Sequence, residues 1–217
     1  TFRRIIEEKT AILDIGGGSI QISLFDKDTL VSTQNLRLGV LRLQELLNHL
    51  NAGSTQMERL EDELATAQLD DYKKLYLKDR EIKNIIIVDD YLSPWAVRKA
   101  HERGEVNAVV DRKAFSQLME ALRTKGTTEL AKRMDIAEEK VPLVYISAIL
   151  TRRIAELMGA ELVWAPGVTL CDGIAYEYAE QNKMFRGEHD FAEDIIACAL
   201  NISKRYNGSS KRADTLE

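Results

Sequence analysis

The sequence predicts an α/β protein: a mixed sheet with helices on both faces, plus one further helix at the C-terminus. Three observations support this fold class. The chain opens with short strands of alternating polarity, residues 85–88 form a β-branched run with no polar position, and helical spacing of leucine and isoleucine separates the strands. Because a strand without polar alternation is buried on both faces, helices must cover both sides of the sheet.

The first elements are expected to be three antiparallel strands. Residues 11–15 are a short apolar run, three glycines interrupt it, and residues 20–25 resume with polar side chains at alternate positions. This period of two around a glycine turn predicts a hairpin. A polar turn at residues 26–28 then leads into a third strand over residues 30–36.

Helices and strands alternate in the middle of the chain. Leucine spacing predicts a helix over residues 38–47 and a long, solvated amphipathic helix over 56–83 with a break near 70–71. A Ser-Pro pair and two glycines mark helix starts and ends further on. After the buried run the expected elements are a helix over 93–103, a strand over 106–110, a helix over 112–123, a helix over 142–158, a strand over 161–164 and a helix over 170–180.

We divide the chain into a main domain over residues 1–182, a polar linker over 183–190 and a C-terminal part over 191–217. The last part contains an amphipathic helix with little of its own to pack against. The chain also begins at Thr1 rather than Met. We therefore expect a piece of a longer protein, in which this helix is the first of a truncated domain.

Composition limits the function. The 217 residues are 45% hydrophobic with a formal net charge of −5, and no window approaches the ~18 uncharged apolar residues of a membrane span. Mild acidity argues against a general nucleic-acid-binding protein. Two cysteines, Cys171 and Cys198, suit a reducing compartment and are expected to be packing residues. We expect a cytoplasmic protein with no membrane or nucleic-acid partner.

The glycine loop between the first two strands is the candidate site. The run Gly16, Gly17 and Gly18 allows successive backbone N–H groups to converge, as in the backbone nests that hold phosphate oxygens. Ser19 adds a hydroxyl, and Asp14 at the strand end can hold Mg²⁺ or its water. The alternative is a plain hairpin turn, which needs only one or two glycines. The pattern favours phosphate binding.

Three segments resemble the exopolyphosphatase and guanosine pentaphosphate phosphatase (Ppx/GppA) family. Ile-Leu-Asp-Ile-Gly-Gly-Gly-Ser at residues 12–19 is similar to the second phosphate loop of the family. Arg-Leu-Gly-Val-Leu-Arg-Leu at 37–43 resembles the Leu-Gly-x-x-Arg-Leu segment that follows, and Leu-Cys-Asp-Gly-Ile-Ala-Tyr at 170–176 is similar to the closing Arg-Glu-Gly-x-x-Tyr element. The resemblance covers residues 1–182.

The resemblance implies the second lobe of an actin-like ATPase (ribonuclease H-like) fold, with the active site in the cleft to a first lobe. It implies metal-assisted attack of water on the terminal phosphate of polyphosphate or guanosine pentaphosphate, with Mg²⁺ as the cofactor of the full-length protein. Asp14 and Gln21 are then the catalytic candidates, Asp14 also the metal ligand, and residues 16–19 the phosphate-binding loop. Because the other lobe would carry the remaining catalytic groups, this chain alone should be inactive. The resemblance also implies a homodimer.

Three departures from the family pattern bear on activity. Gln21 stands where glutamate is usual, and an amide cannot accept a proton or hold Mg²⁺ as a carboxylate does. Asp89 and Asp90 replace a Gly-x-x-Gly-Thr turn, and two carboxylates would repel a polyanion. Cys171 stands where arginine is common. The alternative function is a catalytically degenerate family member that binds a phosphorylated signal or a protein partner without hydrolysis.

The C-terminal helix resembles the opening of a metal-dependent HD phosphohydrolase domain. The histidine that follows the first helix of that domain has no counterpart around residues 211–214, and His189 precedes the helix. His49 and His101 have no Cys or His at ligand spacing and are expected at the surface. The sequence therefore predicts no metal site outside the glycine loop.

Overall fold

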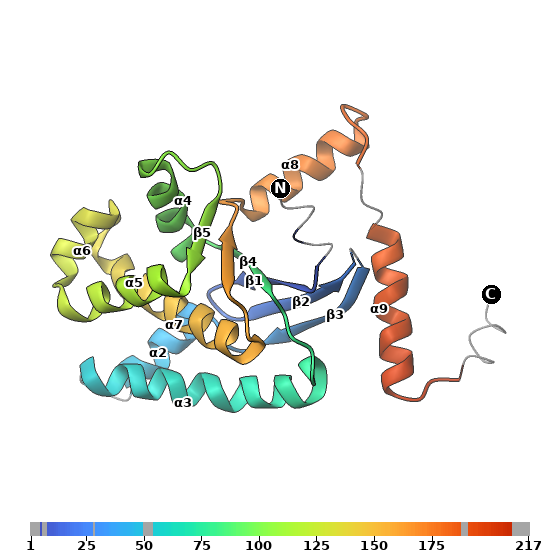
Figure 1. The fold of residues 1–217 in the computed structure, drawn as a ribbon, viewed down its shortest axis with the longest axis horizontal. Helices are drawn as coiled ribbons and strands as arrows, with labels where there is room; N and C mark the ends of the chain where they lie inside the picture. The colour runs from blue at the N-terminus through green and yellow to red at the C-terminus, as the bar shows by residue number, and fades with distance from the viewer. Residues whose placement is uncertain (1–4, 6–7, 28, 50–53, 188–190, 210–217) are drawn as a thin grey trace.

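The computed structural model describes residues 5, 8–27, 29–49, 54–187 and 191–209. These residues form one six-stranded sheet surrounded by helices (Figure 1). The strands are β1 (Thr10–Ile15), β2 (Ile20–Asp26), β3 (Thr29–Leu36), β4 (Asn84–Asp89), β5 (Ala108–Asp111) and β6 (Leu162–Ala165). Their order across the sheet is β3-β2-β1-β4-β6-β5.

The sheet is mixed, as the sequence predicts. Strands β1, β2 and β3 form an antiparallel meander, and β4 lies parallel to β1 and to β6. Strand β5 pairs antiparallel with β6 at the far edge. The central position of β4 explains why its apolar run lacks alternation: the side chains of Ile85, Ile86 and Ile87 are all buried.

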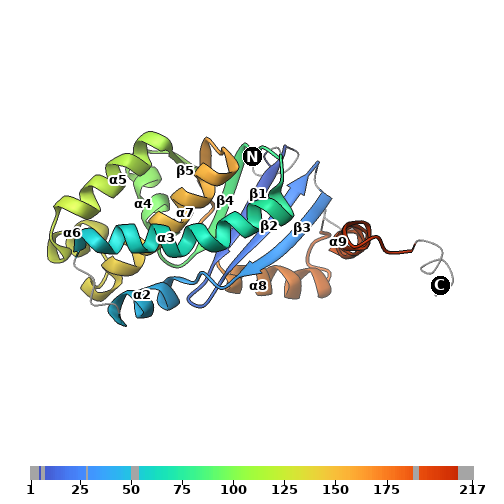
Figure 2. The same cartoon turned by 90° about the horizontal axis from the view of Figure 1, so that it is seen from below.

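The helices lie on both sides of the sheet. Helices α2, α3 and α7 pack together over one face, whereas α8 lies on the opposite side (Figures 1 and 2). The α-helices are α2 (Val40–His49), α3 (Ser54–Tyr72), α4 (Leu92–Glu102), α5 (Arg112–Thr124), α6 (Thr127–Met134), α7 (Val141–Met158), α8 (Leu170–Gln181) and α9 (Phe191–Arg205). None of the helices among the described residues is long and apolar enough to cross a membrane.

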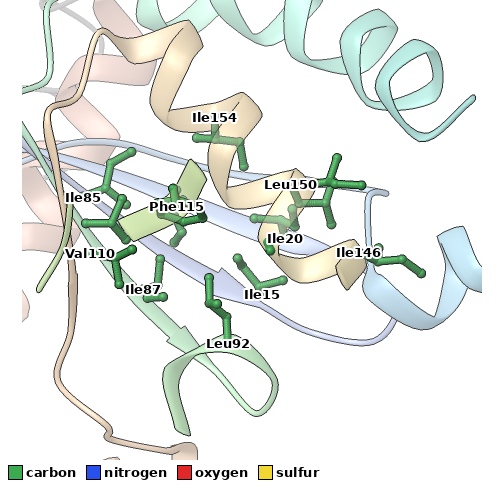
Figure 3. Packing of buried hydrophobic residues seen from close by; sticks show 14 of the residues in the cluster. Ile15, Ile20, Ile85, Ile87, Leu92, Val110, Phe115, Ile146, Leu150 and Ile154 are labelled. Atoms are coloured by element: carbon green, nitrogen blue, oxygen red, sulfur yellow. The ribbon is translucent and has the colours of Figure 1, made fainter. Parts of the chain in front are cut away.

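Helix α7 and the sheet enclose the core. Isoleucines from β1, β2 and β4 face the apolar stripe of α7 (Figure 3). Pro142 occupies the first turn of α7, where its missing N–H costs nothing, and Gly159 ends the helix with a φ of 72°. The labelled core residues of Figure 3 are Ile15, Ile20, Ile85, Ile87, Leu92, Val110, Phe115, Ile146, Leu150 and Ile154.

Three elements differ from the sequence prediction. The long helix expected over residues 56–83 ends at Tyr72 and is followed by a π-helical turn, Lys73–Leu77, close to the expected break. The short helix α6 was not predicted, because its buried side chains are only Leu130, Ala131 and Met134. Strand β5 begins two residues later than expected, since Val106 is 91% exposed.

The C-terminal helix has a packing partner, contrary to the expectation that it has little to pack against. Helix α9 packs against the edge strand β3 and crosses its direction (Figures 1 and 2). The Leu30 N–H donates to Oδ1 of Asp194 at 3.3 Å, and the guanidinium of Arg205 lies 4.4 Å from the ring centroid of Tyr76. The expectations for residues 1–4, 188–190 and 211–214 lie outside the described residues.

Candidate functional site

The glycine loop is fixed through its carbonyl groups. The Gly16 N–H closes the turn on the Ser19 carbonyl at 2.9 Å. The first turn of α2 then binds the loop, because the Val40 N–H donates to the Gly16 carbonyl at 3.0 Å and the Arg42 N–H to the Gly17 carbonyl at 3.1 Å. The loop is therefore attached to the helix that follows the three-stranded meander.

Arg42 reinforces this attachment with its side chain. Its Nε donates to the Gly18 carbonyl at 3.0 Å, so the carbonyl oxygens of all three glycines accept hydrogen bonds from α2. These carbonyl oxygens would otherwise repel an anion at the loop. Because α2 donates hydrogen bonds to these carbonyl oxygens, a ligand can approach the loop from the side of its N–H groups.

Gly39 makes the close approach to the loop, and a larger residue cannot replace it. A Cβ atom at Gly39 would lie 2.1 Å from the Gly17 carbonyl oxygen, a distance that requires the backbone to move. Gly18, in contrast, has no atom within 4 Å of an added Cβ. The Leu-Gly pair noted in the sequence is thus explained by contact with the glycine loop.

Two amides of the loop are available to a ligand. Among the described residues, neither the N–H of Gly17 nor the N–H of Gly18 donates a hydrogen bond to another part of the chain. Backbone N–H groups exposed on successive residues form anion-binding concavities in proteins. Ser19 adds its hydroxyl, which accepts a hydrogen bond from the Asn35 side-chain amide at 3.2 Å. Within the described part of the chain, the loop thus presents two unbonded backbone N–H groups and one hydroxyl.

Asp14 lies beside the loop on the exposed face of β1. It is the cross-strand partner of Gln21 on β2, and Gln21 is in turn the partner of Asn35 on β3. The three side chains therefore form one polar row across the end of the meander. Partial burial, and secondly the charge of Asp90, raise the pKa of Asp14 above its usual value. Asp14 and Gln21, the two catalytic candidates from the sequence, thus lie opposite each other on neighbouring strands.

Asp89 corrects the expectation that two carboxylates face the site. It is buried, and its two oxygens accept from the backbone N–H groups of Leu92 and Ser93, each at 2.7 Å. The Ser147 hydroxyl of α7 adds a third bond at 2.7 Å. Asp89 therefore stabilises the start of α4, and Asp90 alone remains exposed beside Asp14.

A pocket of about 300 Å³ borders Asp90 at the carboxyl ends of β4 and β6. Its polar lining includes Arg98, His101 and Thr169. Arg98 is already engaged, because its guanidinium lies 3.4 Å from a carboxylate oxygen of Asp135. No local sequence pattern predicts this pocket, since its lining comes from segments far apart in the chain.

The closing motif around residue 172 is structural. Asp172 accepts from the Thr169 N–H at 2.7 Å and from the Thr169 hydroxyl at 2.8 Å, which forms a capping box at the start of α8. The backbone and hydroxyl hydrogen bonds from Thr169 lower the pKa of Asp172. Cys171 is exposed, so its expected packing role is wrong, whereas His49 and His101 are exposed as expected.

Sequence comparison with models of known protein families and with curated proteins gives no match. Solved structures do match. An exopolyphosphatase from Cytophaga hutchinsonii is 14% identical with a TM-score of 0.61, and the match covers 76% of this chain and 58% of that one. A Ppx/GppA family member from Aquifex aeolicus is 11% identical with a TM-score of 0.65, covering 81% and 57%.

The fold of this chain is similar to that of solved exopolyphosphatase and Ppx/GppA structures. An exopolyphosphatase-like protein, 15% identical with a TM-score of 0.62, agrees, and its match covers 80% of this chain and 60% of that one. The predicted α/β fold, a mixed sheet with helices on both faces, is therefore confirmed, and these solved structures share it. The chain spans less than two thirds of the length of these Ppx/GppA structures.

Proposed function

We propose that the glycine loop binds the terminal phosphate of polyphosphate or guanosine pentaphosphate in a phosphohydrolase. One observation supports this proposal. The carbonyl oxygens of the loop accept hydrogen bonds from α2, whereas the N–H groups of Gly17 and Gly18 make no hydrogen bond within the described residues and can bind a ligand. The similar fold of a solved exopolyphosphatase supports the choice of substrate class.

The residues beside the loop fit a divalent cation. Asp14 and Asp90 are close enough for the charge of Asp90 to raise the pKa of Asp14, and a cation between the two carboxylates would relieve that repulsion. The described residues contain no group of three or more metal-binding side chains. Mg²⁺ commonly takes one or two carboxylates and completes its shell with water and substrate phosphates, so Asp14 and Asp90 would be the residues to hold it. When bound, Mg²⁺ would neutralise part of the negative charge of the phosphate.

The roles of the chain's own residues follow from this arrangement. The loop amides and the Ser19 hydroxyl orient the terminal phosphate, and Asp14 accepts hydrogen bonds from water beside it. Positioning and charge neutralisation account for most of the catalysis in phosphoryl transfer. Because the chain covers less than two thirds of the matching structures, we expect the 217-residue chain to bind phosphate weakly and to turn over nothing.

A second function is favoured by one observation. Gln21 is the direct cross-strand partner of Asp14, at the position where a second carboxylate would complete an acidic pair. An amide there can hydrogen-bond water but cannot accept its proton. The protein would then bind a phosphorylated signal, or a protein partner, without hydrolysing anything.

Phosphate release from polyphosphate and from guanosine pentaphosphate with Mg²⁺, measured on the longest native form of the protein, separates the two functions. Release supports the phosphohydrolase, and binding without release supports the second function. Gly18→Pro removes a loop amide, whereas Gly18→Ala is the matched control because an added Cβ meets nothing within 4 Å. Equal polyphosphate binding by the two variants would show that the loop is not the site.

A further inference from the structure

Asn35 lies at the end of the meander that borders the glycine loop. It is exposed on β3, and its cross-strand partner on β2 is Gln21. Its side chain nevertheless bonds two residues further toward the loop, because Nδ2 of Asn35 donates to Oγ of Ser19 at 3.2 Å. Ser19 is the last residue of the loop, since its carbonyl closes the turn with the Gly16 N–H. Asn35 therefore reaches the candidate site from a different strand.

The direction of this hydrogen bond determines what the Ser19 hydroxyl can do. An amide nitrogen only donates, whereas a serine hydroxyl has one proton to donate and two lone pairs that accept. Because Asn35 occupies a lone pair of the Ser19 oxygen, the hydroxyl proton points elsewhere. Among the described residues, no group accepts this proton. The Ser19 hydroxyl is therefore a donor that a ligand can use.

Three successive residues of the loop then offer hydrogen-bond donors to a ligand. Gly17 and Gly18 have backbone N–H groups that make no hydrogen bond within the described residues, and Ser19 adds its hydroxyl proton. An ionised phosphate oxygen only accepts hydrogen bonds, so it binds to donors of this kind. A hydroxyl that turned its lone pairs toward the phosphate would repel it instead. The orientation of the Ser19 hydroxyl therefore matters for phosphate affinity.

A second pair on the same strands shows what distinguishes Asn35. Ser23 and Thr33 are cross-strand partners on β2 and β3, and their hydroxyl oxygens lie 2.9 Å apart, with either able to donate. The pair lies two residues further from the loop on the same face of the sheet, since side chains alternate along a strand. Two hydroxyls join the strands without fixing which of them donates. The amide of Asn35 joins the strand to the loop and fixes the direction as well.

The backbone holds Asn35 in place beside the loop. The next residue, Leu36, pairs with Ile20 at the start of β2. Three residues later, Gly39 approaches the Gly17 carbonyl so closely that an added Cβ would lie 2.1 Å from its oxygen. The segment that follows Asn35 is therefore in contact with the loop as well as with the strand after it, and the Asn35 amide needs no rearrangement to reach the loop hydroxyl.

We propose that Asn35 is a positioning residue, which directs the Ser19 hydroxyl proton toward an ionised phosphate bound at the glycine loop. The proposal rests on the phosphate site of the proposed function but does not require hydrolysis. It adds a side chain from outside the loop to the groups that determine phosphate affinity. It also restricts the ligand at this point to a group that accepts a hydrogen bond.

A double-mutant cycle with Ser19 tests this role. Titration calorimetry measures the binding of inorganic tripolyphosphate, with Mg²⁺, to the longest native form of the protein. Ser19→Ala should lower the affinity about tenfold, because a hydrogen bond to an anion is lost, and Asn35→Ala should lower it about threefold. In the Ser19→Ala background, Asn35→Ala should have no further effect, because no hydroxyl is left to direct. A residue that only joined the strands would lower the affinity in both backgrounds.

Thr33→Val is the matched control, because it removes the comparable hydrogen bond to Ser23 and keeps the size of the side chain. It should bind tripolyphosphate as the wild type does, and circular dichroism checks that every variant is folded. Wild-type affinity in Asn35→Ala, an equal loss in both backgrounds, or a similar loss in Thr33→Val would overturn the positioning role alone. Equal binding by Gly18→Pro and Gly18→Ala would instead show that the loop is not the site, which overturns the proposed function together with this role.

Discussion

Two neighbouring parallel strands each carry an aspartate near the carboxyl end, and the two aspartates have opposite roles. Asp14 near the end of β1 is exposed beside Gly16 and has its pKa raised. Asp89 at the end of β4 is buried and accepts three hydrogen bonds at 2.7 Å, from two backbone N–H groups and the Ser147 hydroxyl. The two aspartates are offset by one residue in the pairing of the strands, because Asp14 pairs with Val88 and Ile15 pairs with Asp89.

This offset of one residue explains why the two aspartates have different surroundings. Side chains alternate between the faces of a strand, so Asp14 and Asp89 point to opposite sides of the sheet. Asp89 reaches the core side, where α7 and the start of α4 supply donors. Asp14 reaches the open side, where water and a ligand are the available partners. The local donors, not the strand end itself, decide whether a carboxylate stabilises the fold or is free to bind.

The largest expected effect concerns the attachment of the glycine loop. Gly39→Ala places a Cβ 2.1 Å from the Gly17 carbonyl oxygen, so the loop and α2 must separate. We expect a loss of more than about 4 kcal/mol in the free energy of unfolding, measured by urea denaturation. Gly18→Ala should change it by less than about 1 kcal/mol. Equal losses in the two variants would mean that the loop is not held by this contact.

The next-largest effect distinguishes Asp89, the last residue of β4, from the adjacent Asp90. Asp89→Ala leaves two N–H groups at the start of α4 and the Ser147 hydroxyl without their acceptor, and should cost about 3 kcal/mol. Asp90→Ala should stay within about 0.5 kcal/mol of the wild type by the same urea assay. The order reverses for Mg²⁺ affinity, which calorimetry should show lowered by about tenfold in Asp90→Ala.

Arg42→Gln tests a smaller contribution. It removes the bond from the Arg42 Nε to the Gly18 carbonyl but leaves the backbone bonds of α2 to the loop. We expect a loss of about 1 kcal/mol in stability, because the bond is exposed. Arg59→Gln, an exposed change on α3, is the control and should cost less, since its ion pair with Glu63 lies in solvent.

The smallest effect is on the titration of Asp14. Asp90→Asn removes the second cause of its raised pKa, so the pKa should fall part of the way toward its usual value, while burial keeps the rest of the shift. A raised pKa means that ionised Asp14 destabilises the fold at neutral pH, and that this cost disappears as the pH falls through the pKa. Carboxyl NMR titration measures the shift; an unchanged Asp14 pKa would show that Asp90 does not act on it.

Local patterns predicted most of the fold. Periodicity predicts the three-stranded meander and the buried strand β4. Pro142 and Gly159 predict where α7 begins and ends. The glycine loop and the pairing of Asp14 with Gln21 were also predictable, because a hairpin fixes its own register. These features depend on residues close together in the sequence.

Features that depend on distant residues could not be predicted. The burial of Asp89 requires Ser147 on α7, and the need for glycine at position 39 arises from contact with the Gly17 carbonyl. The pocket beside Asp90 combines α4 with the segment before α8. The orientation of α9 follows from contacts with β3 and Tyr76, whereas its amphipathic pattern alone would place the apolar side inward.

The hydrogen bonds from α2 to the glycine loop also determine when the loop loses its conformational freedom. Because Val40 and Arg42 hold its carbonyl oxygens in the folded chain, the loop is ordered during folding and not when an anion arrives. Little further entropy is then lost on binding. In amide hydrogen exchange the two edges of the same loop should therefore differ, with slow exchange at Val40 and Arg42 and rapid exchange at Gly17 and Gly18 until an anion protects them.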